Sequence, residues 1–311
     1  MSDDLLERVR ATGLLPEGAG VVVLLSGGRD SVCLLDVSVA LGCVVRALHV
    51  NYGLREGADG DEAHCRALCE RLGVALTVRR AERPEDAHGN LQAWARDLRY
   101  AAATELAGGG LVAVAHTATD QAETVLYRLA SSPGRRALLG MAPRTGRLVR
   151  PLLTVTREHT AAWCRARGLA WRDDPTNETD AYARGRVRGT LLPALEAVDP
   201  RAAANIVRTA QLLREEAEVL DVVVETALAG RDRIAREHLA ALPPALARLV
   251  VRRLAEAATG GLCARAAARL DDILALGDAG ALDVGDGARA VVEGGVLRFE
   301  PTPPLPVHEP G

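Results

Sequence analysis

The chain has 311 residues, enough for two domains of about 150 residues each, and its 48% hydrophobic and 25% charged residues are typical of globular proteins. We expect a cytoplasmic protein without a membrane partner. No apolar run approaches the ~18 residues of a membrane helix, and the first residues are acidic, unlike a secretory signal. The six cysteines form no CxxC pair, which argues against a zinc ribbon or a Cys-ligated iron–sulfur cluster.

The chain contains no lysine, so the GxxxxGK(S/T) phosphate loop cannot occur. The net charge of −3 is unevenly distributed. Residues 135–188 hold 12 arginines against 5 acidic residues, a local charge of +7, which leaves −10 for the rest of the chain. A basic segment inside an acidic chain indicates either a polyanionic partner or a solvated, arginine-rich surface.

Short β-branched runs alternate with helical patterns in the first 170 residues. Strands are predicted over 20–25, 44–50, 74–79, 111–115 and 148–153, and helices from residue 31 to 41 and over 61–72, 91–106, 120–130 and 157–167. This alternation predicts an α/β domain with a Rossmann-like parallel sheet and helices on both faces. Ligands of such sheets bind beyond the carboxyl ends of the strands, which here are followed by residues 26–31, 49–55 and 116–123.

The pattern changes after Pro200. One long helix is predicted over 202–227, shorter helices over 243–257 and 264–275, and a small β-hairpin within 280–300. We therefore expect a first domain over 1–200, a long connecting helix over 201–230, and a smaller, mostly helical domain with the hairpin over 231–311.

The strongest motif is SGGRDS, which follows a hydrophobic strand and precedes a helix. Gly27 and Gly28 permit a tight turn that presents bare N–H groups to an anion, and Ser26 and Ser31 add hydroxyl donors at the amino end of the helix. Asp30 would repel a phosphate unless Mg²⁺ lay between them, so the loop predicts a magnesium-bound polyphosphate with Asp30 as metal ligand. The alternative is an ordinary strand–turn–helix in which a serine is the N-cap.

This loop resembles the signature of the PP-loop (N-type) ATP pyrophosphatases. That family splits ATP between its α and β phosphates, transfers AMP to a carbonyl oxygen and releases pyrophosphate. The resemblance implies that ATP and Mg²⁺ are bound by Ser26, Gly27, Gly28, Arg29, Asp30 and Ser31.

Six further motifs narrow the resemblance. In chain order they are HVNYGLR (49–55), ARDLRY (95–100), HTATDQAET (116–124), RPLL (150–153), WRDDPTN (171–177) and RGRVR (184–188). Together they resemble the tRNA(Ile)-lysidine synthase family over most of residues 20–200, which makes the first domain the catalytic one. In that family the wobble cytidine of tRNA(Ile) with a CAU anticodon is adenylated at C2, and free L-lysine then displaces AMP to give lysidine.

The resemblance implies that His49 and Asn51 line the nucleotide pocket and that His116, Asp120 and Glu123 are catalytic together with the PP-loop aspartate. The pKa of a lysine ammonium is about 10.4, so its deprotonation at pH 7 costs roughly 4.6 kcal/mol, and the reaction needs a carboxylate that receives the ammonium and a base that takes its proton. Asp120 and Glu123 share a helix face. Their spacing also fits a capping box with Asp120 as N-cap, and His49 taken alone fits a plain strand-end histidine.

The family motifs also contain the residues expected to contact tRNA or its phosphates. An isolated arginine is more often a surface residue, but motif position and the basic segment favour phosphate contact. These residues are Arg96, Arg99, Arg150, Asp174, Asn177, Arg184 and Arg188. The C-terminal domain is expected to help bind the tRNA. The expected partners are this tRNA and free L-lysine, and homodimer formation is left open.

Two alternatives stay open. The first is a PP-loop adenylating enzyme that acts on a small-molecule carbonyl or on another tRNA base, and the arginine-rich segment argues against a small molecule. The second is a non-catalytic nucleotide- or RNA-binding module, and the intact SGGRDS loop with its acid argues against it.

Overall fold

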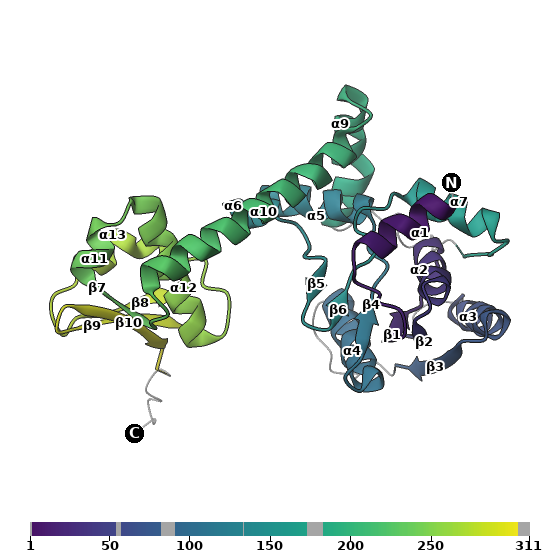
Figure 1. The fold of residues 1–311 in the computed structure, drawn as a ribbon, viewed down its shortest axis with the longest axis horizontal. Coiled ribbons are helices and arrows are strands. Elements are labelled where there is room, and N and C mark those ends of the chain that lie inside the picture. Colours follow the sequence, from purple (N-terminus) through teal and green to yellow (C-terminus); the bar gives the residue numbers. More distant parts are fainter. Residues whose placement is uncertain (1, 54–56, 82–90, 133, 173–182, 304–311) are drawn as a thin grey trace, which may run out of the picture. The chain divides into compact units, whose positions relative to one another are not determined.

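The computed structural model describes residues 2–53, 57–81, 91–132, 134–172 and 183–303 (Figure 1). The chain divides into two compact units, Met1–Leu213 and Arg214–Gly311. The division falls within the long helix α10 (Ala202–Leu228), so it lies inside the segment predicted as a connecting helix. The domain limits at 200 and 230 remain predictions.

The first unit is built on a mostly parallel sheet in the strand order β3-β2-β1-β4-β6-β5. Only β5 runs antiparallel, against β6. The strand bounds are β1 Gly20–Leu24, β2 Val44–Asn51, β3 Ala75–Arg80, β4 Leu111–Ala113, β5 Arg144–Thr145 and β6 Leu148–Val149. The sheet confirms the predicted α/β class. The fifth predicted strand is much shorter than expected, because Pro151 has no N–H for a strand ladder and the chain turns there.

Helices cover both faces of this sheet. The helices before α10 are α1 Ser2–Ala11, α2 Arg29–Ala40, α3 Ala58–Leu72, α4 Leu91–Ala107, α5 Ala118–Ser131, α6 Arg135–Leu138, α7 Arg157–Ala166, α8 Ala183–Arg186, the π-helical turn η2 Val187–Leu191, and α9 Leu192–Val198. Alternate residues of β1 enter two cores. Val21 and Val23 pack with α1, α2, α3 and α7, whereas Val22 and Leu24 pack with α4 on the opposite face.

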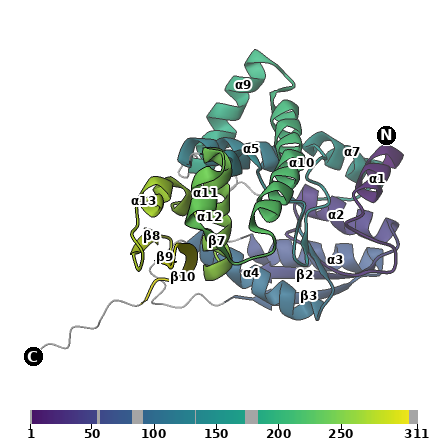
Figure 2. The same cartoon turned by 60° about the vertical axis from the view of Figure 1, so that its left-hand side comes forward.

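The second unit has its own core and an antiparallel sheet in the order β7-β10-β9-β8. Its elements are β7 Arg233–Ala235, α11 Arg236–Ala241, α12 Pro244–Thr259, the 3₁₀ turn η3 Ala266–Arg269, α13 Leu270–Leu274, β8 Ala281–Gly285, β9 Ala288–Glu293 and β10 Val296–Pro301. Helices α11 and α12 lie beside this sheet (Figure 2).

The sheet is larger than the hairpin expected from the sequence. Asp286 and Gly287 have φ values of 55° and 75°, which suits a two-residue hairpin turn between β8 and β9, and β10 adds a third strand. The fourth strand, β7, is three residues long with one buried side chain, Ile234, so it leaves no alternating pattern to detect. Within the described residues, no helix is both long and apolar enough to cross a membrane.

Candidate functional site

The PP-loop connects β1 to α2 through a turn that requires glycine. Gly27 has φ +85°, and a Cβ there would lie 3.3 Å from Cys65 Sγ and 3.4 Å from His64 Cδ2 on α3. Gly28 follows in an extended conformation as the N-cap of α2 and has no side chain to cap the helix. The alternative with a serine N-cap is therefore wrong. No side chain of the N-cap residue covers the amino end of α2, so its backbone N–H groups can bind an anion.

Both serines of the motif hold this turn together. The backbone N–H of Ser26 donates to Ser31 Oγ at 3.2 Å, and the two hydroxyl oxygens are 3.1 Å apart. Ser31 Oγ donates to the Gly28 carbonyl at 2.8 Å, and the Gly28 N–H contacts Ser26 Oγ at 3.3 Å. The loop is thus organised by its own side chains before any ligand binds.

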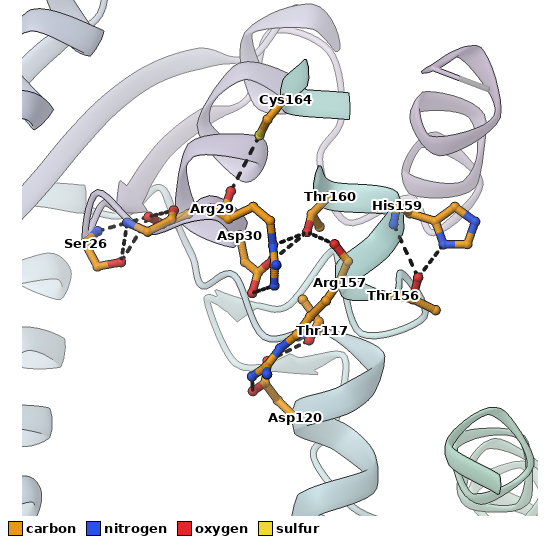
Figure 3. Close-up of polar contacts among 12 residues, drawn as sticks. Ser26, Arg29, Asp30, Thr117, Asp120, Thr156, Arg157, His159, Thr160 and Cys164 are labelled. Atoms are coloured by element: carbon orange, nitrogen blue, oxygen red, sulfur yellow. Dashed lines mark hydrogen bonds and ion pairs between the residues drawn. The ribbon is translucent and has the colours of Figure 1, made fainter. Parts of the chain in front are cut away.

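Asp30 lies at the start of α2 with its side chain 21% exposed (Figure 3). Its Oδ1 accepts a 2.5 Å hydrogen bond from Thr160 Oγ1 and a 3.0 Å bond from Arg29 Nε, whereas Oδ2 lies 3.5 Å from an Arg29 NH2 nitrogen. No cluster of three potential ligands that could hold a metal occurs among the described residues. Mg²⁺ is commonly held by one or two carboxylates together with substrate phosphates, so a single carboxylate beside a phosphate loop fits a metal that arrives with the nucleotide.

His49 and Asn51 stand at the end of β2, and both are buried. His49 Nδ1 lies 2.9 Å from the Leu25 carbonyl oxygen. The Asn51 amide donates to Asp59 at 3.1 Å and to Glu62 at 3.0 Å, and its oxygen accepts the Gly53 N–H at 2.9 Å. The Asn51 bond, with help from Arg66, lowers the pKa of Glu62 to about 2. Both side chains organise the chain around the PP-loop, and their contact with a nucleotide remains a prediction.

The helix α5 begins with a capping box, three residues earlier in the chain than the one considered from the sequence. Its N-cap is Thr117, and Asp120 occupies the N3 position. Asp120 Oδ2 accepts from the Thr117 N–H and from Thr117 Oγ1, both at 2.8 Å. The helix starts at Ala118, so Asp120 cannot be the N-cap and Glu123 has no capping role.

Two arginines bind the carboxylates of Asp120 and Glu123. Arg188 contacts Glu123 through two parallel bonds, Nε to Oε1 at 2.7 Å and NH2 to Oε2 at 2.8 Å. Arg157 NH2 lies 3.3 Å from Asp120 Oδ1 and 3.9 Å from Glu123 Oε1. The bonds to Glu123 raise the pKa of Arg188. Arg188 was expected to contact RNA, and in this structure its guanidinium is paired with a carboxylate of the same site.

His116 follows β4, close to Asp120. Burial lowers its pKa to about 4, and the positive charges of Arg150, Arg99 and Arg96 act in the same direction, against the opposing effect of Asp120. Its Nδ1 is buried and has no hydrogen-bond partner among the described residues. With this lowered pKa His116 is neutral at pH 7, and its buried Nδ1 has unused hydrogen-bonding capacity among the described residues.

Three arginines, Arg96, Arg99 and Arg150, lie near His116. Arg128 lies near Arg96, Arg150 and Arg184. We call these five residues the arginine cluster. The Cζ atoms of Arg96 and Arg99 lie 5.2 and 5.8 Å from the centre of the Tyr100 ring, and that of Arg184 lies 5.7 Å from the Tyr127 ring. Burial lowers the pKa of both Arg128 and Arg150, and neighbouring arginines lower them further.

Among the described residues, no acidic side chain pairs with Arg150, the most buried member of the cluster. Arg150 is 7% exposed and donates through one NH1 nitrogen to the Ala142 carbonyl at 2.7 Å and to Thr145 Oγ1 at 3.3 Å. The Nε atoms of Arg150 and Arg99 are buried and unpartnered in the described part of the chain. Buried cations of one sign are costly without a partner, so the cluster favours an anionic ligand.

The structure thus brings together most of the residues that the sequence singled out. Asp174 and Asn177 lie outside the described residues. Sequence reasoning missed Arg128, Arg157 and Thr160. Arg157 lies in the basic segment directly after the N-cap Thr156, a signal for a helix start, but no motif pointed to Thr160.

Comparisons with known proteins identify the family of the first unit. A family model described as a PP-loop domain matches residues 5–195. Among solved structures, the U34-tRNA thiolase NcsA from Methanococcus maripaludis has a similar fold with a TM-score of 0.58, at 18% identity over 68% of this chain and 78% of that one. This likeness concerns the fold alone.

Several curated relatives carry one name. A tRNA(Ile)-lysidine synthase from Parabacteroides distasonis is 42% identical over 69% of this chain, and one from Thermus thermophilus is 40% identical over 80% of it. The chain spans about half the length of each (50%). A tRNA(Ile)-lysidine synthase from Gloeobacter violaceus is 36% identical over 80% of this chain and 81% of the relative. With a PP-loop domain over most of the first unit and these relatives, the chain belongs to the tRNA(Ile)-lysidine synthase family.

Proposed function

We propose that the chain ligates L-lysine to C2 of the wobble cytidine of tRNA(Ile) with a CAU anticodon, through an adenylated cytidine, releasing AMP and pyrophosphate. The observation that carries the proposal is the site in which the PP-loop acid, Asp30, and the Asp120–Glu123 pair are joined through one helix, α7 (Figure 3). The names of the relatives support the same reaction.

In the first step, the PP-loop binds ATP. The backbone N–H groups of the Gly27–Gly28 turn and of the amino end of α2 would donate to phosphate oxygens, and Asp30 would hold Mg²⁺. When bound, Mg²⁺ neutralises charge that develops on the phosphoryl oxygens. The cytidine O2 attacks the α-phosphorus, the bond between the α-phosphorus and its bridging oxygen to the β-phosphate breaks, and pyrophosphate leaves.

In the second step, the Asp120–Glu123 pair receives the lysine side chain. Both carboxylates bind guanidinium groups in this structure, so the lysine ammonium would share them with Arg157 and Arg188. The amine attacks C2 after it loses a proton, and the C2–O bond to AMP breaks. Asp120, Glu123 and the neutral His116 are the groups proposed to accept the ammonium and its proton.

The arginine cluster supplies the proposed contact with RNA phosphates. Phosphate contacts give affinity, and an unstacked base of the anticodon loop in the pocket gives specificity. Asp174, Asn177 and the second unit are proposed to add tRNA contacts, and the reaction is proposed to take place in the cytoplasm, where tRNA and ATP occur together. A small-molecule carbonyl substrate is the alternative. The buried Nε atoms of Arg99 and Arg150, which have no partner among the described residues, favour a polyanion over it.

The test is incubation of the protein with ATP, Mg²⁺, isotope-labelled lysine and a tRNA(Ile) transcript with a CAU anticodon, followed by nucleoside analysis. We expect label in lysidine and one pyrophosphate per modified tRNA. A matched transcript with uridine at the wobble position should incorporate none. Pyrophosphate release with small carboxylic acids and none with the tRNA would contradict the proposal and favour the alternative.

A further inference from the structure

The first turn of α7 contacts both acidic parts of the candidate site (Figure 3). Thr156 caps the helix by accepting the His159 N–H at 3.3 Å. One residue later, Arg157 reaches Asp120, and three residues further on Thr160 donates its 2.5 Å bond to Asp30. A single helical turn therefore connects the PP-loop acid with the carboxylate pair on α5.

Three polar groups meet at the Thr160 hydroxyl, which is completely buried (0% exposed). Its shortest contact is the 2.5 Å bond to Asp30, and the Arg157 carbonyl oxygen lies 3.0 Å away. It also accepts from Arg29 Nε at 3.1 Å. A hydroxyl has one proton to donate, and a carboxylate is the stronger acceptor, so the proton goes to Asp30.

Arg29 competes for the same carboxylate. Its Nε lies 3.0 Å from Asp30 Oδ1 and its NH2 nitrogen 3.5 Å from Oδ2, close to the geometry of a two-pronged guanidinium–carboxylate pair. The Arg29 Nε–H is shared between Asp30 Oδ1 and the Thr160 oxygen. The Thr160 hydroxyl in turn donates its proton to Oδ1. Without this hydroxyl, Arg29 can close on both oxygens of Asp30, and a guanidinium bound in this way competes with a metal ion.

We propose that Thr160 is a positioning residue for Asp30, holding Oδ1 against α7 so that Oδ2 stays available to the Mg²⁺ that accompanies ATP. The proposal rests on the proposed function, because only there does Asp30 bind a metal. Thr160 touches neither substrate nor metal in this account, and its effect is on how readily Mg²⁺ and ATP bind together.

The test compares Thr160→Val, which keeps the shape but removes the hydroxyl, with Thr160→Ser, which keeps the hydroxyl. Calorimetric titrations with ATP at a series of Mg²⁺ concentrations give the concentration of Mg²⁺ that supports half-maximal ATP binding. We expect Thr160→Val to raise it about tenfold, and Thr160→Ser to stay within about threefold of the unmodified protein. Thr160→Ala, expected to behave like Thr160→Val, replaces it if that variant does not fold.

A matched control separates positioning from packing. Asp36 on α2 accepts the Trp163 Nε1–H of α7 at 2.8 Å and pairs with Arg167, so Asp36→Asn weakens the same helix contact away from Asp30. We expect this variant to lower the thermal unfolding midpoint without moving the Mg²⁺ requirement. An unchanged requirement in Thr160→Val, equal loss in Thr160→Ser, or the same shift in Asp36→Asn would each overturn the proposal.

The variant Asp30→Asn shows whether a negative result concerns only the positioning role of Thr160 or the proposed function as well. If Asp30→Asn raises the Mg²⁺ requirement and Thr160→Val does not, the positioning role is wrong and the role of Asp30 stands. If Asp30→Asn leaves the requirement unchanged, Asp30 is not the metal ligand, and the proposed first step fails together with the positioning role.

Discussion

Arg188 and Glu123 form a two-bond ion pair although 65 residues separate them in the chain. The Glu123 side chain is 6% exposed and that of Arg188 is 33% exposed. A carboxylate this buried depends on its partner, because an unpaired charge away from water is costly. The pair therefore ties η2 to α5, and its removal should affect the stability of the first unit.

We expect Arg188→Ala to lower the free energy of unfolding by about 1–3 kcal/mol, less than for a fully buried pair because water reaches the guanidinium. Glu123→Gln should cost less, since it removes the buried charge itself. Urea unfolding of the two single variants and of the double variant gives the coupling free energy between Arg188 and Glu123. Arg201→Ala is the control, because its pair with Asp199 is exposed and should contribute no more than about 0.5 kcal/mol. Equal effects of Arg188→Ala and Arg201→Ala would contradict this view.

Asp30→Ala should reduce tRNA-dependent pyrophosphate release on the order of 10²–10³-fold, because the charge on the transferring phosphoryl group loses its metal ligand. The variant should still fold, with a lower thermal unfolding midpoint, because the buried Thr160 hydroxyl and Arg29 lose their carboxylate partner. Normal release of pyrophosphate by the folded variant would remove the metal role assigned to Asp30.

Arg184→Ala should weaken tRNA binding by about tenfold and leave ATP binding unchanged. Its guanidinium lies over Tyr127 in the arginine cluster, away from the PP-loop contacts. Filter binding at several salt concentrations should show the slope of log affinity against log salt reduced by about one for each phosphate that the variant no longer neutralises. Arg8→Ala removes an exposed arginine of the same unit, paired with Asp4, and serves as control. Equal loss of tRNA and ATP binding in Arg184→Ala would argue against a tRNA role.

His116 makes stability depend on pH. Its pKa is about 4 in the folded chain and near 6.5 when exposed, so between these values the unfolded chain binds more protons and stability falls as the pH falls. The loss should reach about 3 kcal/mol at most near pH 4 and vanish above about pH 7. Urea unfolding between pH 4 and 8 should show a flatter profile for His116→Gln. An NMR titration of the His116 ring with a midpoint near 6.5 would contradict the expectation.

The alternation of buried runs and helices was sufficient to predict the sheet, because a parallel strand is buried on both faces and leaves a plain hydrophobic signal. The SGGRDS motif likewise identified the turn, since Gly27 needs both a left-handed conformation and room against Cys65. Local signals of this kind depend on few neighbouring residues. The capping box of α5 is also a local feature. It was misplaced because Asp120 and Glu123 have the same spacing as the true pair, Thr117 and Asp120.

The pairings that join distant segments were not predictable in the same way. Thr160 meets Asp30 across 130 residues, and nothing in a buried threonine on a helix says which group it will face. Arg128 was missed for a similar reason, because its role depends on Arg96 and Arg184, which come from other helices. Such side-chain pairs depend on how α4, α5, α7 and α8 pack together. This packing cannot be predicted from a single sequence.

The shared attachment of two acids to the start of α7 has a mechanical consequence. Arg157 and Thr160 are three residues apart, an axial distance of about 4.5 Å along one rigid helix. Any displacement of that helix moves the partners of Asp120 and Asp30 together, so it would change the environment of both carboxylates at once.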